Sequence, residues 1–196
     1  RASFVYLSMR NYILCISILL LISLIKGQDS DFSVIKFKVG DAAPNWSLKT
    51  ESGKFEFLKN WTVKKHRQLR KPSIQPDRHV VLFVFFATWC PPCVDQLQPL
   101  EEVYQKYKND KIKFFIIDET DPDSDAPDTR TMLSEKNINI PYVVDDWKIG
   151  SRYGVKAIPT IFIVDKYGII QNIRTAFNED EDFMAELSGI IDPLLR

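Results

Sequence analysis

Cys90 and Cys93 stand three positions apart in the stretch FVFFATWCPPC, and the chain holds only one other cysteine, Cys15. The thiolate form of a cysteine attacks a disulfide, and a second thiol one helical turn away can then displace the mixed disulfide that forms. This spacing therefore indicates disulfide exchange, in which Cys90 attacks and Cys93 resolves.

The sequence around the pair predicts the elements that position it. Residues 79–89 form a continuous apolar run, typical of a strand buried on both faces, and residues 94–107 carry apolar side chains at helical spacing, with Pro99 as a kink. Cys90 then falls where a strand ends and a helix begins. Free backbone N–H groups and the helix dipole at such a junction lower the pKa of a thiol from about 8.5, which favours Cys90 as the nucleophile.

A CxxC pair also occurs as half of a zinc site or as a structural disulfide. A tetrahedral zinc site needs two further ligands, and the only histidines, His66 and His79, do not stand at ligand spacing. A disulfide that closes so short a loop would restrict the unfolded chain very little. Exchange chemistry is therefore the preferred interpretation, with no metal and no organic cofactor.

A second feature is the segment VKAIPTIFIVD at residues 155–165. Proline at the start of a buried strand removes a ladder hydrogen bond unless it lies at the strand edge. A cis bond between Ile158 and Pro159 would turn the chain sharply and expose the backbone of Ile158 for pairing with an extended peptide.

The remaining segments predict the α/β class. Residues 32–61 indicate short strands in a hairpin-rich extension, residues 62–78 a basic loop with prolines, and residues 111–119 a second buried strand. A short helix and a short strand follow, then a hairpin over residues 158–177 and a final helix with Asn178 as its cap. We expect a central mixed β-sheet with helices on both faces.

The first 27 residues differ from the rest. A basic residue follows Met9, and residues 12–25 are apolar, which is the pattern of a secretory signal peptide and is short for a membrane span of about 20 residues. We expect residues 1–27 to be a signal peptide or, alternatively, an N-terminal anchor, with residues 1–8 upstream of the start. Residues 28–196 would then form one globular domain.

The 26 basic and 26 acidic side chains balance, which disfavours a nucleic-acid-binding protein. Asn45 and Asn60 match the N-glycosylation acceptor. The basic residues within 64–71 predict a solvated loop or, alternatively, a contact with an acidic partner or an anionic lipid surface.

Together, ATWCPPC and the later AIPTIFIVD resemble the thioredoxin superfamily. Upstream, VGDAAPNWSLKTESGKFEFLKNW resembles the N-terminal extension of the redoxin, or TlpA-like, thiol–disulfide oxidoreductases, and SEKNINIPYVVDDWKIGSRYGV is similar to their inserted helix and strand. The resemblance covers residues 38–196 and implies a thioredoxin fold with an N-terminal β-hairpin extension and a cis peptide bond at Pro159.

The resemblance also implies a redox-active Cys90–Cys93 centre and a role in cell redox homeostasis. The partners would be protein thiols and disulfides and an upstream electron donor, and the chain would be a monomer that meets a membrane only through an N-terminal anchor. The groove for the partner would be lined by Trp89, Pro91, Pro92, Ile158 and Pro159.

The chain departs from the family pattern in its acidic residues. Val84 stands where thioredoxins carry a buried aspartate, and Gln96 where TlpA-like proteins often carry a glutamate. The proton acceptor for the resolving thiol is therefore open, with Asp95, Asp118 and Glu119 as candidates.

Peroxiredoxins share the extension, but their threonine stands three residues before a lone peroxidatic cysteine. Here Thr88 stands two residues before Cys90 and the CxxC is intact, which disfavours a peroxidase. Pro91 and Pro92 fit the first helical turn but remove two N–H donors that could have stabilised the Cys90 thiolate. We therefore expect a less acidic Cys90 and a protein that acts as a reductant.

Two alternatives to an exported oxidoreductase remain open. A tryparedoxin- or nucleoredoxin-like intracellular reductase also resembles WCPPC, but it requires that the apolar N-terminus not direct export. Export would place the protein in the secretory pathway, outside the cell or in a periplasm- or lumen-like compartment. The other alternative is a binding or chaperone-like module that uses the groove at Ile158 and Pro159 without redox turnover.

Overall fold

The computed structural model describes residues 36–50, 52–69, 71, 75, 77–121, 123–145 and 148–196. The predicted signal peptide or anchor at residues 1–27 lies outside them. The elements are β1 (Ser47–Thr50), β2 (Phe55–Phe57), α2 (Leu58–Trp61), β3 (Val80–Phe86), α3 (Pro91–Asp95), α4 (Leu97–Tyr107), β4 (Ile112–Asp118), α5 (Thr129–Glu135), β5 (Tyr142–Val144), α6 (Ile149–Tyr153), β6 (Thr160–Val164), β7 (Ile170–Thr175) and α7 (Phe183–Leu195).

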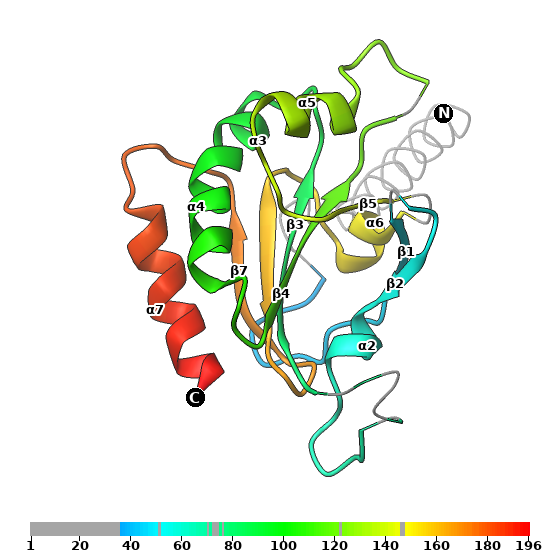
Figure 1. Cartoon of the computed structure of the whole chain (residues 1–196), viewed down its shortest axis with the longest axis vertical. Coiled ribbons are helices and arrows are strands. Elements are labelled where there is room, and N and C mark those ends of the chain that lie inside the picture. The colour runs from blue at the N-terminus through cyan, green and yellow to red at the C-terminus, as the bar shows by residue number, and fades with distance from the viewer. Residues whose placement is uncertain are drawn as a thin grey trace, which may run out of the picture. The chain divides into compact units, whose positions relative to one another are not determined.

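The strands form one mixed sheet in the order β2-β1-β5-β4-β3-β6-β7 (Figure 1). β3 and β4 are parallel, with Val80 opposite Ile112 and Phe86 opposite Asp118. β5 continues the parallel set beyond β4, whereas β6 pairs antiparallel with both β3 and β7. The apolar run at residues 79–89 therefore supplies β3, a strand buried on both faces, as predicted.

Successive strand residues point to opposite faces of the sheet, so each face has its own hydrophobic core. Helices α3, α4 and α7 cover one face, and α2 and α6 lie on the other (Figure 1). The first core, named the disulfide core, includes Leu82, Val84, Phe86, Cys90, Cys93, Leu97, Leu100, Val103, Ile116, Ile161, Ile163, Leu187 and Ile191. The second, named the aromatic core, includes Trp46, Leu48, Leu58, Phe83, Phe85, Phe115, Val143, Ile149, Tyr153 and Phe162.

The N-terminal extension is part of the aromatic core. β1 and β2 form the predicted hairpin, and β1 also pairs antiparallel with β5. Trp46 is fully buried, with its ring edge-on to Phe83 and Phe115 at 5.9 and 5.4 Å between centroids. The Tyr153 hydroxyl on α6 donates to the Pro44 carbonyl at 2.5 Å. The extension is thus fixed both by its strand ladder and by its side chains.

The final helix begins later than the sequence predicts. Asn178 is not its cap, because the Asn178 side chain accepts a hydrogen bond from the Asp180 N–H within a preceding turn. Asp182 caps α7 instead, accepting from the Ala185 N–H at 2.9 Å. Glu181, which the prediction placed inside the helix, pairs with the buried Arg174 of β7.

The predicted kink at Pro99 is present as a break between two helices. α3 ends at Asp95 and α4 begins at Leu97, with Gln96 between them. Pro99 has no N–H to donate to the Asp95 carbonyl four residues earlier, so the helical ladder is interrupted there. The short α3 therefore presents the two cysteines on a segment separate from α4. In the described part of the chain, no helix combines the length and the apolar character that a membrane crossing requires.

Candidate functional site

The candidate site is the disulfide between Cys90 and Cys93, which joins α3 to the end of the loop that follows β3. Cys90 is the N-cap of α3, and Cys93 lies one turn into the helix, with 5.2 Å between the two Cα atoms. The N–H groups of Cys93 and Val94 donate to the Cys90 carbonyl at 3.0 and 3.1 Å. This is the strand-to-helix junction that the sequence predicts.

The two sulfurs differ in how far they reach solvent. The residue Cys90 is 5% exposed and Cys93 is 1% exposed, so attack from outside can reach Cys90 more readily. Beside them Trp89 is 58% exposed, an unusual position for so large an apolar side chain, and Pro91 and Pro92 are also exposed. The structure therefore surrounds the opening to Cys90 with an apolar rim.

The turn before β6 forms the opposite side of this opening. The Ile158–Pro159 peptide bond is cis, as predicted, and the Ile158 carbonyl oxygen lies 3.6 Å from the Cys90 Sγ. In the disulfide that sulfur carries no hydrogen, so the approach is a contact that only a reduced Cys90 could turn into a hydrogen bond. The Thr160 hydroxyl donates to the Ala157 carbonyl at 2.7 Å and fixes the turn.

Of the five predicted groove residues, four lie at the surface around Cys90. Ile158 is half-buried, and Trp89, Pro91 and Pro92 are exposed. Pro159 is buried, and its carbonyl accepts from the Ala176 N–H of the neighbouring strand segment. Pro159 is thus a buried part of the turn, while the Ile158 carbonyl points toward Cys90.

The loop that carries the cysteines is held by the residues that follow β4. The Thr120 hydroxyl accepts from the Thr88 N–H at 3.0 Å, and the Thr120 N–H donates to the Asp118 carboxylate at 2.9 Å. The Glu119 N–H donates to the Phe86 carbonyl at 2.8 Å. The ends of two parallel strands are thereby tied together immediately before Cys90.

The three candidate proton acceptors lie in different places. Asp95 is exposed on α3. Asp118 is buried and stands opposite Phe86 in a parallel ladder, so its side chain points to the same face as Phe86, which belongs to the disulfide core. Glu119 points to the other face, where its carboxylate packs directly on Gly150 of α6. Of these three candidates, Asp118 is thus the buried one on the cysteine side of the sheet.

Glu119 has an unusual environment of its own. Burial raises the pKa of its carboxyl from 4.5 to about 7, and the nearby carboxylates of Asp145 and Asp118 add to the rise. Asp145 accepts from the N–H groups of Ile149 and Gly150 at 2.8 and 3.0 Å at the start of α6. Glu119 can therefore exchange a proton near neutral pH, on the face of the sheet opposite the cysteines.

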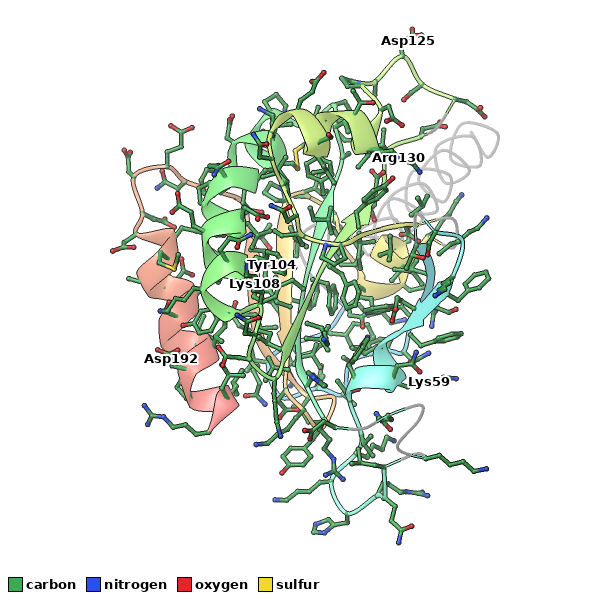
Figure 2. The ribbon with its side chains drawn as sticks, in the orientation of Figure 1. Lys59, Tyr104, Lys108, Asp125, Arg130 and Asp192 are labelled. Carbon is green, nitrogen blue, oxygen red and sulfur yellow. A yellow bond between two sulfur atoms is a disulfide. The ribbon has the colours of Figure 1, made fainter. Side chains whose placement is uncertain are left out.

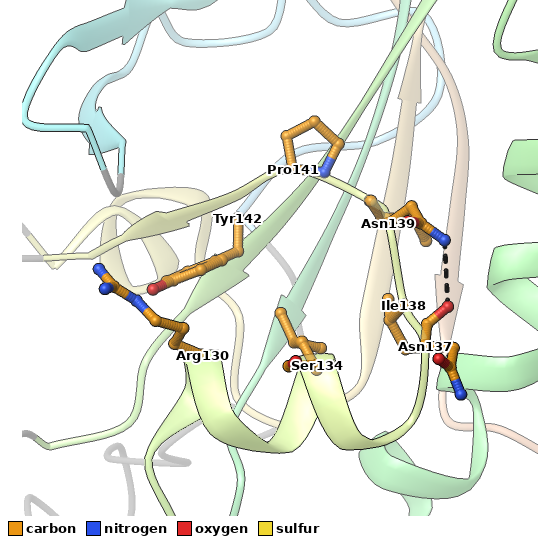
Figure 3. Close-up of a pocket in the computed structure, with 9 residues that line it drawn as sticks. Arg130, Ser134, Asn137, Ile138, Asn139, Pro141 and Tyr142 are labelled. Carbon is orange, nitrogen blue, oxygen red and sulfur yellow. Dashed lines mark hydrogen bonds between the residues drawn. The ribbon is translucent and has the colours of Figure 1, made fainter.

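A cavity of about 550 Å³ lies away from the cysteines, between α5 and the segment that leads into β5 (Figure 3). Figure 3 shows Asn139 and its hydrogen bond to the Asn137 carbonyl, at 3.1 Å. The buried Glu101 of α4 accepts from both the N–H and the side-chain amide of Asn139, at 2.8 and 2.9 Å. The lining residues that the structure describes include no thiol, and these contacts indicate a structural role for the segment.

The sequence analysis did not predict the hydrogen bond between Thr88 and Thr120 or the burial of Gln96. An aspartate followed two residues later by an N–H donor, as in Asp118 and Thr120, is an Asx-type turn that the sequence could have indicated. Gln96 is buried, and its Nε2 has no hydrogen-bond partner among the described residues. No local sequence pattern predicts that Gln96 is buried.

The similarity to known proteins covers the region that contains the two cysteines and the turn at Pro159. Residues 39–173 match the model of the AhpC/TSA family. The thioredoxin-like protein YneN of Bacillus subtilis is 30% identical over 135 residues, which cover 69% of this chain and 70% of YneN. The thiol-disulfide oxidoreductase ResA of Bacillus thuringiensis is 28% identical over 141 residues, 71% of each chain.

Solved structures share the fold. The thioredoxin domain of a thiol-disulfide oxidoreductase from Bacteroides vulgatus superposes with a TM-score of 0.61 at 17% identity, over 82% of this chain and all of that one. StoA of Bacillus subtilis gives 0.56 at 17% identity, over 76% and 96% of the two chains. The predicted thioredoxin fold is confirmed.

Proposed function

Because the chain belongs to the AhpC/TSA family and is a thioredoxin-like thiol–disulfide oxidoreductase, we propose that it exchanges its Cys90–Cys93 pair with cysteines of protein partners. The observation that carries this proposal is the geometry at Cys90. A disulfide stands at a strand-to-helix junction, with the apolar rim of Trp89 on one side and the Ile158 carbonyl 3.6 Å away on the other.

The exchange runs in two balanced steps. In the reduced protein the Cys90 thiolate attacks one sulfur of a partner disulfide, which forms a mixed disulfide and releases one partner thiolate. The Cys93 thiolate then attacks the Cys90 sulfur, closes the Cys90–Cys93 bond and releases the second partner thiolate. Two electrons pass to the partner, and a dithiol donor upstream must reduce the pair again.

Cys93 must lose a proton before it attacks, and Asp118 is the candidate acceptor. Of the three candidates, it is the buried one that shares a face of the sheet with the cysteines. We expect Asp118→Asn to slow the second step roughly 10- to 100-fold. Asp95→Asn, a change on the exposed side of α3, is the matched control and should leave that step unchanged. Equal rates for both variants would reject Asp118.

The direction of electron flow is proposed to be reduction of the partner. Pro91 and Pro92 supply no N–H groups in the first turn of α3, and the first N–H groups present donate to the Cys90 carbonyl, so none is directed at the Cys90 sulfur. A less stabilised thiolate favours the disulfide form of the protein and therefore a reductant.

Residues 1–27 are proposed to direct export or to anchor the chain, and residues 28–196 to form the oxidoreductase domain. The domain would act as a monomer on partners in the secretory pathway or in a periplasm- or lumen-like space. Locating the full chain with a C-terminal tag separates this proposal from an intracellular reductase.

The decisive experiment traps the first step. Cys93→Ser should accumulate a mixed disulfide through Cys90, and Cys90→Ser should accumulate none through Cys93. Full activity in the double Cys90→Ser, Cys93→Ser variant would instead support a binding module without redox turnover. The reduction potential, followed by the fluorescence of the exposed Trp89, then tests direction: about −270 mV or lower supports a reductant, and about −180 to −120 mV would contradict it.

A further inference from the structure

A second cavity, of about 680 Å³, lies where the turn between β6 and β7 meets α2 and the N-terminal extension. Its size is in the range of small-molecule sites, about 300–1,000 Å³. It is found near the start of β3, since the His79 N–H donates to Trp61 of α2, whereas Cys90 follows the other end of that strand. The seven residues of β3 separate the two sites by roughly 20 Å.

Part of the lining of this cavity is apolar. It consists of Ala42, Ala43, Leu58 and Ile169, which we name the floor. Backbone bonds close it, because the Ala43 N–H donates to the Gly168 carbonyl at 2.9 Å and Ala42 pairs with Ile169 as an isolated bridge. The backbone therefore joins two of the segments that line the cavity.

The single carboxylate among the described lining residues, Asp165, is already occupied. It accepts from the N–H groups of Tyr167 and Ile169 at 2.8 and 2.9 Å and from the Gln171 side chain at 2.9 Å. These bonds hold the β6–β7 turn. Asp165 therefore serves the turn and does not pair with the basic side chains at the mouth of the cavity.

The rim of the cavity is cationic. Lys59, Lys64 and Lys65 line it and are exposed, and Figure 2 shows Lys59 reaching outward from α2. Within the described chain, none of these three ammonium groups has a carboxylate within 4.0 Å. The Lys59 ammonium group instead lies over the Phe57 ring, 5.0 Å from its centre. An apolar floor beside three lysines that have no carboxylate partner among the described residues complements a molecule with an apolar body and a negative head.

We propose that this lysine-rimmed pocket binds an amphipathic anion, in which an apolar chain occupies the floor and a carboxylate or phosphate meets Lys64 and Lys65. The proposal is independent of the thiol chemistry, because the pocket and the disulfide lie at opposite ends of β3. It gives the basic residues within 64–71 a specific role, beyond that of a solvated loop.

The test uses sodium decanoate, below its micelle concentration, and the full chain. Calorimetry should show that Lys64→Glu, Lys65→Glu binds decanoate about tenfold more weakly than the parent, the effect of reversing two exposed rim charges. Lys108→Glu, Lys136→Glu makes the same charge change far from the pocket and should bind like the parent. Because the apolar residues 12–25 are present in all three proteins, the difference between variants is the measurement.

Further arms keep the proposal falsifiable. Decanol, which has the chain but not the charge, should bind the parent more weakly than decanoate and should not distinguish the variants. The amide NMR signals of Ala43, Gly168 and Ile169 should shift on addition of decanoate. Vesicles of phosphatidylcholine with phosphatidylglycerol, compared with phosphatidylcholine alone, distinguish a bilayer lipid from a free amphiphile. Equal losses in both double variants, or no binding of decanoate or of anionic vesicles, would overturn the proposal.

Discussion

The two hydrophobic cores on opposite faces of the sheet are built from different side chains. The aromatic core stacks Phe83 on Phe162, with ring centroids 5.4 Å apart, and sets Tyr153 edge-on to both rings. The disulfide core is mainly aliphatic and contains Cys90 and Cys93. One face is filled by large aromatic rings in contact with one another, whereas the other contains the Cys90–Cys93 disulfide.

This difference indicates a division of roles. The aromatic core includes Trp46 and Leu48 of the extension, so the extension contributes to folding rather than to the chemistry. The disulfide core contains the two sulfurs at the start of a short helix, and a hydrogen bond joins the residues that follow β3 and β4. Stability should therefore respond most to changes in the aromatic core, and activity to changes in the disulfide core.

The largest effect expected on activity comes from Cys90→Ser. It removes the attacking sulfur, so disulfide exchange with a protein substrate should be abolished. The disulfide closes a loop of only four residues, so the free energy of unfolding should fall by about 2 kcal/mol at most. Activity assays and denaturant unfolding of the same preparation check both parts. A large loss of stability would show that the disulfide core also depends on this bond.

The largest effect expected on stability comes from Phe83→Ala in the aromatic core. The lost ring contacts and the cavity left behind should lower the free energy of unfolding by about 3–5 kcal/mol. Leu82→Ala, its neighbour in the disulfide core, is the control on the other face and should cost about 2–4 kcal/mol. Denaturant unfolding measures both. The division of roles fails if the leucine change costs more than the phenylalanine change.

A smaller effect tests how the extension is attached. Tyr153→Phe removes the hydroxyl that donates to the Pro44 carbonyl, while the ring stays in the aromatic core. We expect a loss of about 1 kcal/mol in the free energy of unfolding. Hydrogen exchange should be faster in β1 than in β6 of this variant. Uniform exchange across the sheet would show that this bond does not hold the extension locally.

The smallest effect concerns pH and the carboxyl of Glu119. Its pKa is raised from 4.5 to about 7 by burial and then by Asp145 and Asp118, so the folded state keeps a proton that the unfolded state loses between these pH values. Stability therefore falls as the pH rises through this window and stays level above it. Glu119→Gln should flatten this dependence and, after allowance for solvent screening, add about 1 kcal/mol at pH 8. Denaturant unfolding of both proteins from pH 4.5 to 8 measures this dependence. If the free energy of unfolding of Glu119→Gln changes with pH as steeply as that of the parent, Glu119 is not its cause.

Strong local signals let the sequence predict much of the fold and the candidate site. The apolar run at residues 79–89 predicts the buried strand β3, and the junction at Cys90 follows from it. The cis bond before Pro159 and the N-terminal hairpin were also predicted and are present. Each of these features follows from residues that are close together in the sequence, or from a motif that resembles a known family.

The features that the sequence could not predict depend on contacts between elements, such as the register of one strand against another. Asp118 and Glu119 are adjacent in the chain, yet they face opposite sides of the sheet, and only the register of β4 against β3 shows which one shares the face of Cys93. The predicted cap of α7 at Asn178 is wrong, since Glu181 forms an ion pair with Arg174 of β7 and the helix begins after Asp182. The lysine-rimmed pocket likewise joins segments that are far apart in sequence.

The hairpin at the N-terminus has one more consequence, through the pairing of β1 with β5. β5 has only three residues, and β1 occupies its free side through the pairs of Lys49 with Val144 and Thr50 with Val143. A shortened chain that began after Trp61 would leave the backbone donors and acceptors of β5 open beside a half-uncovered aromatic core. Such an edge is a template for another strand. The extension therefore moves the free edge of the sheet from β5 to β2, a strand of three residues that lies farther from the aromatic core strands β3 and β4.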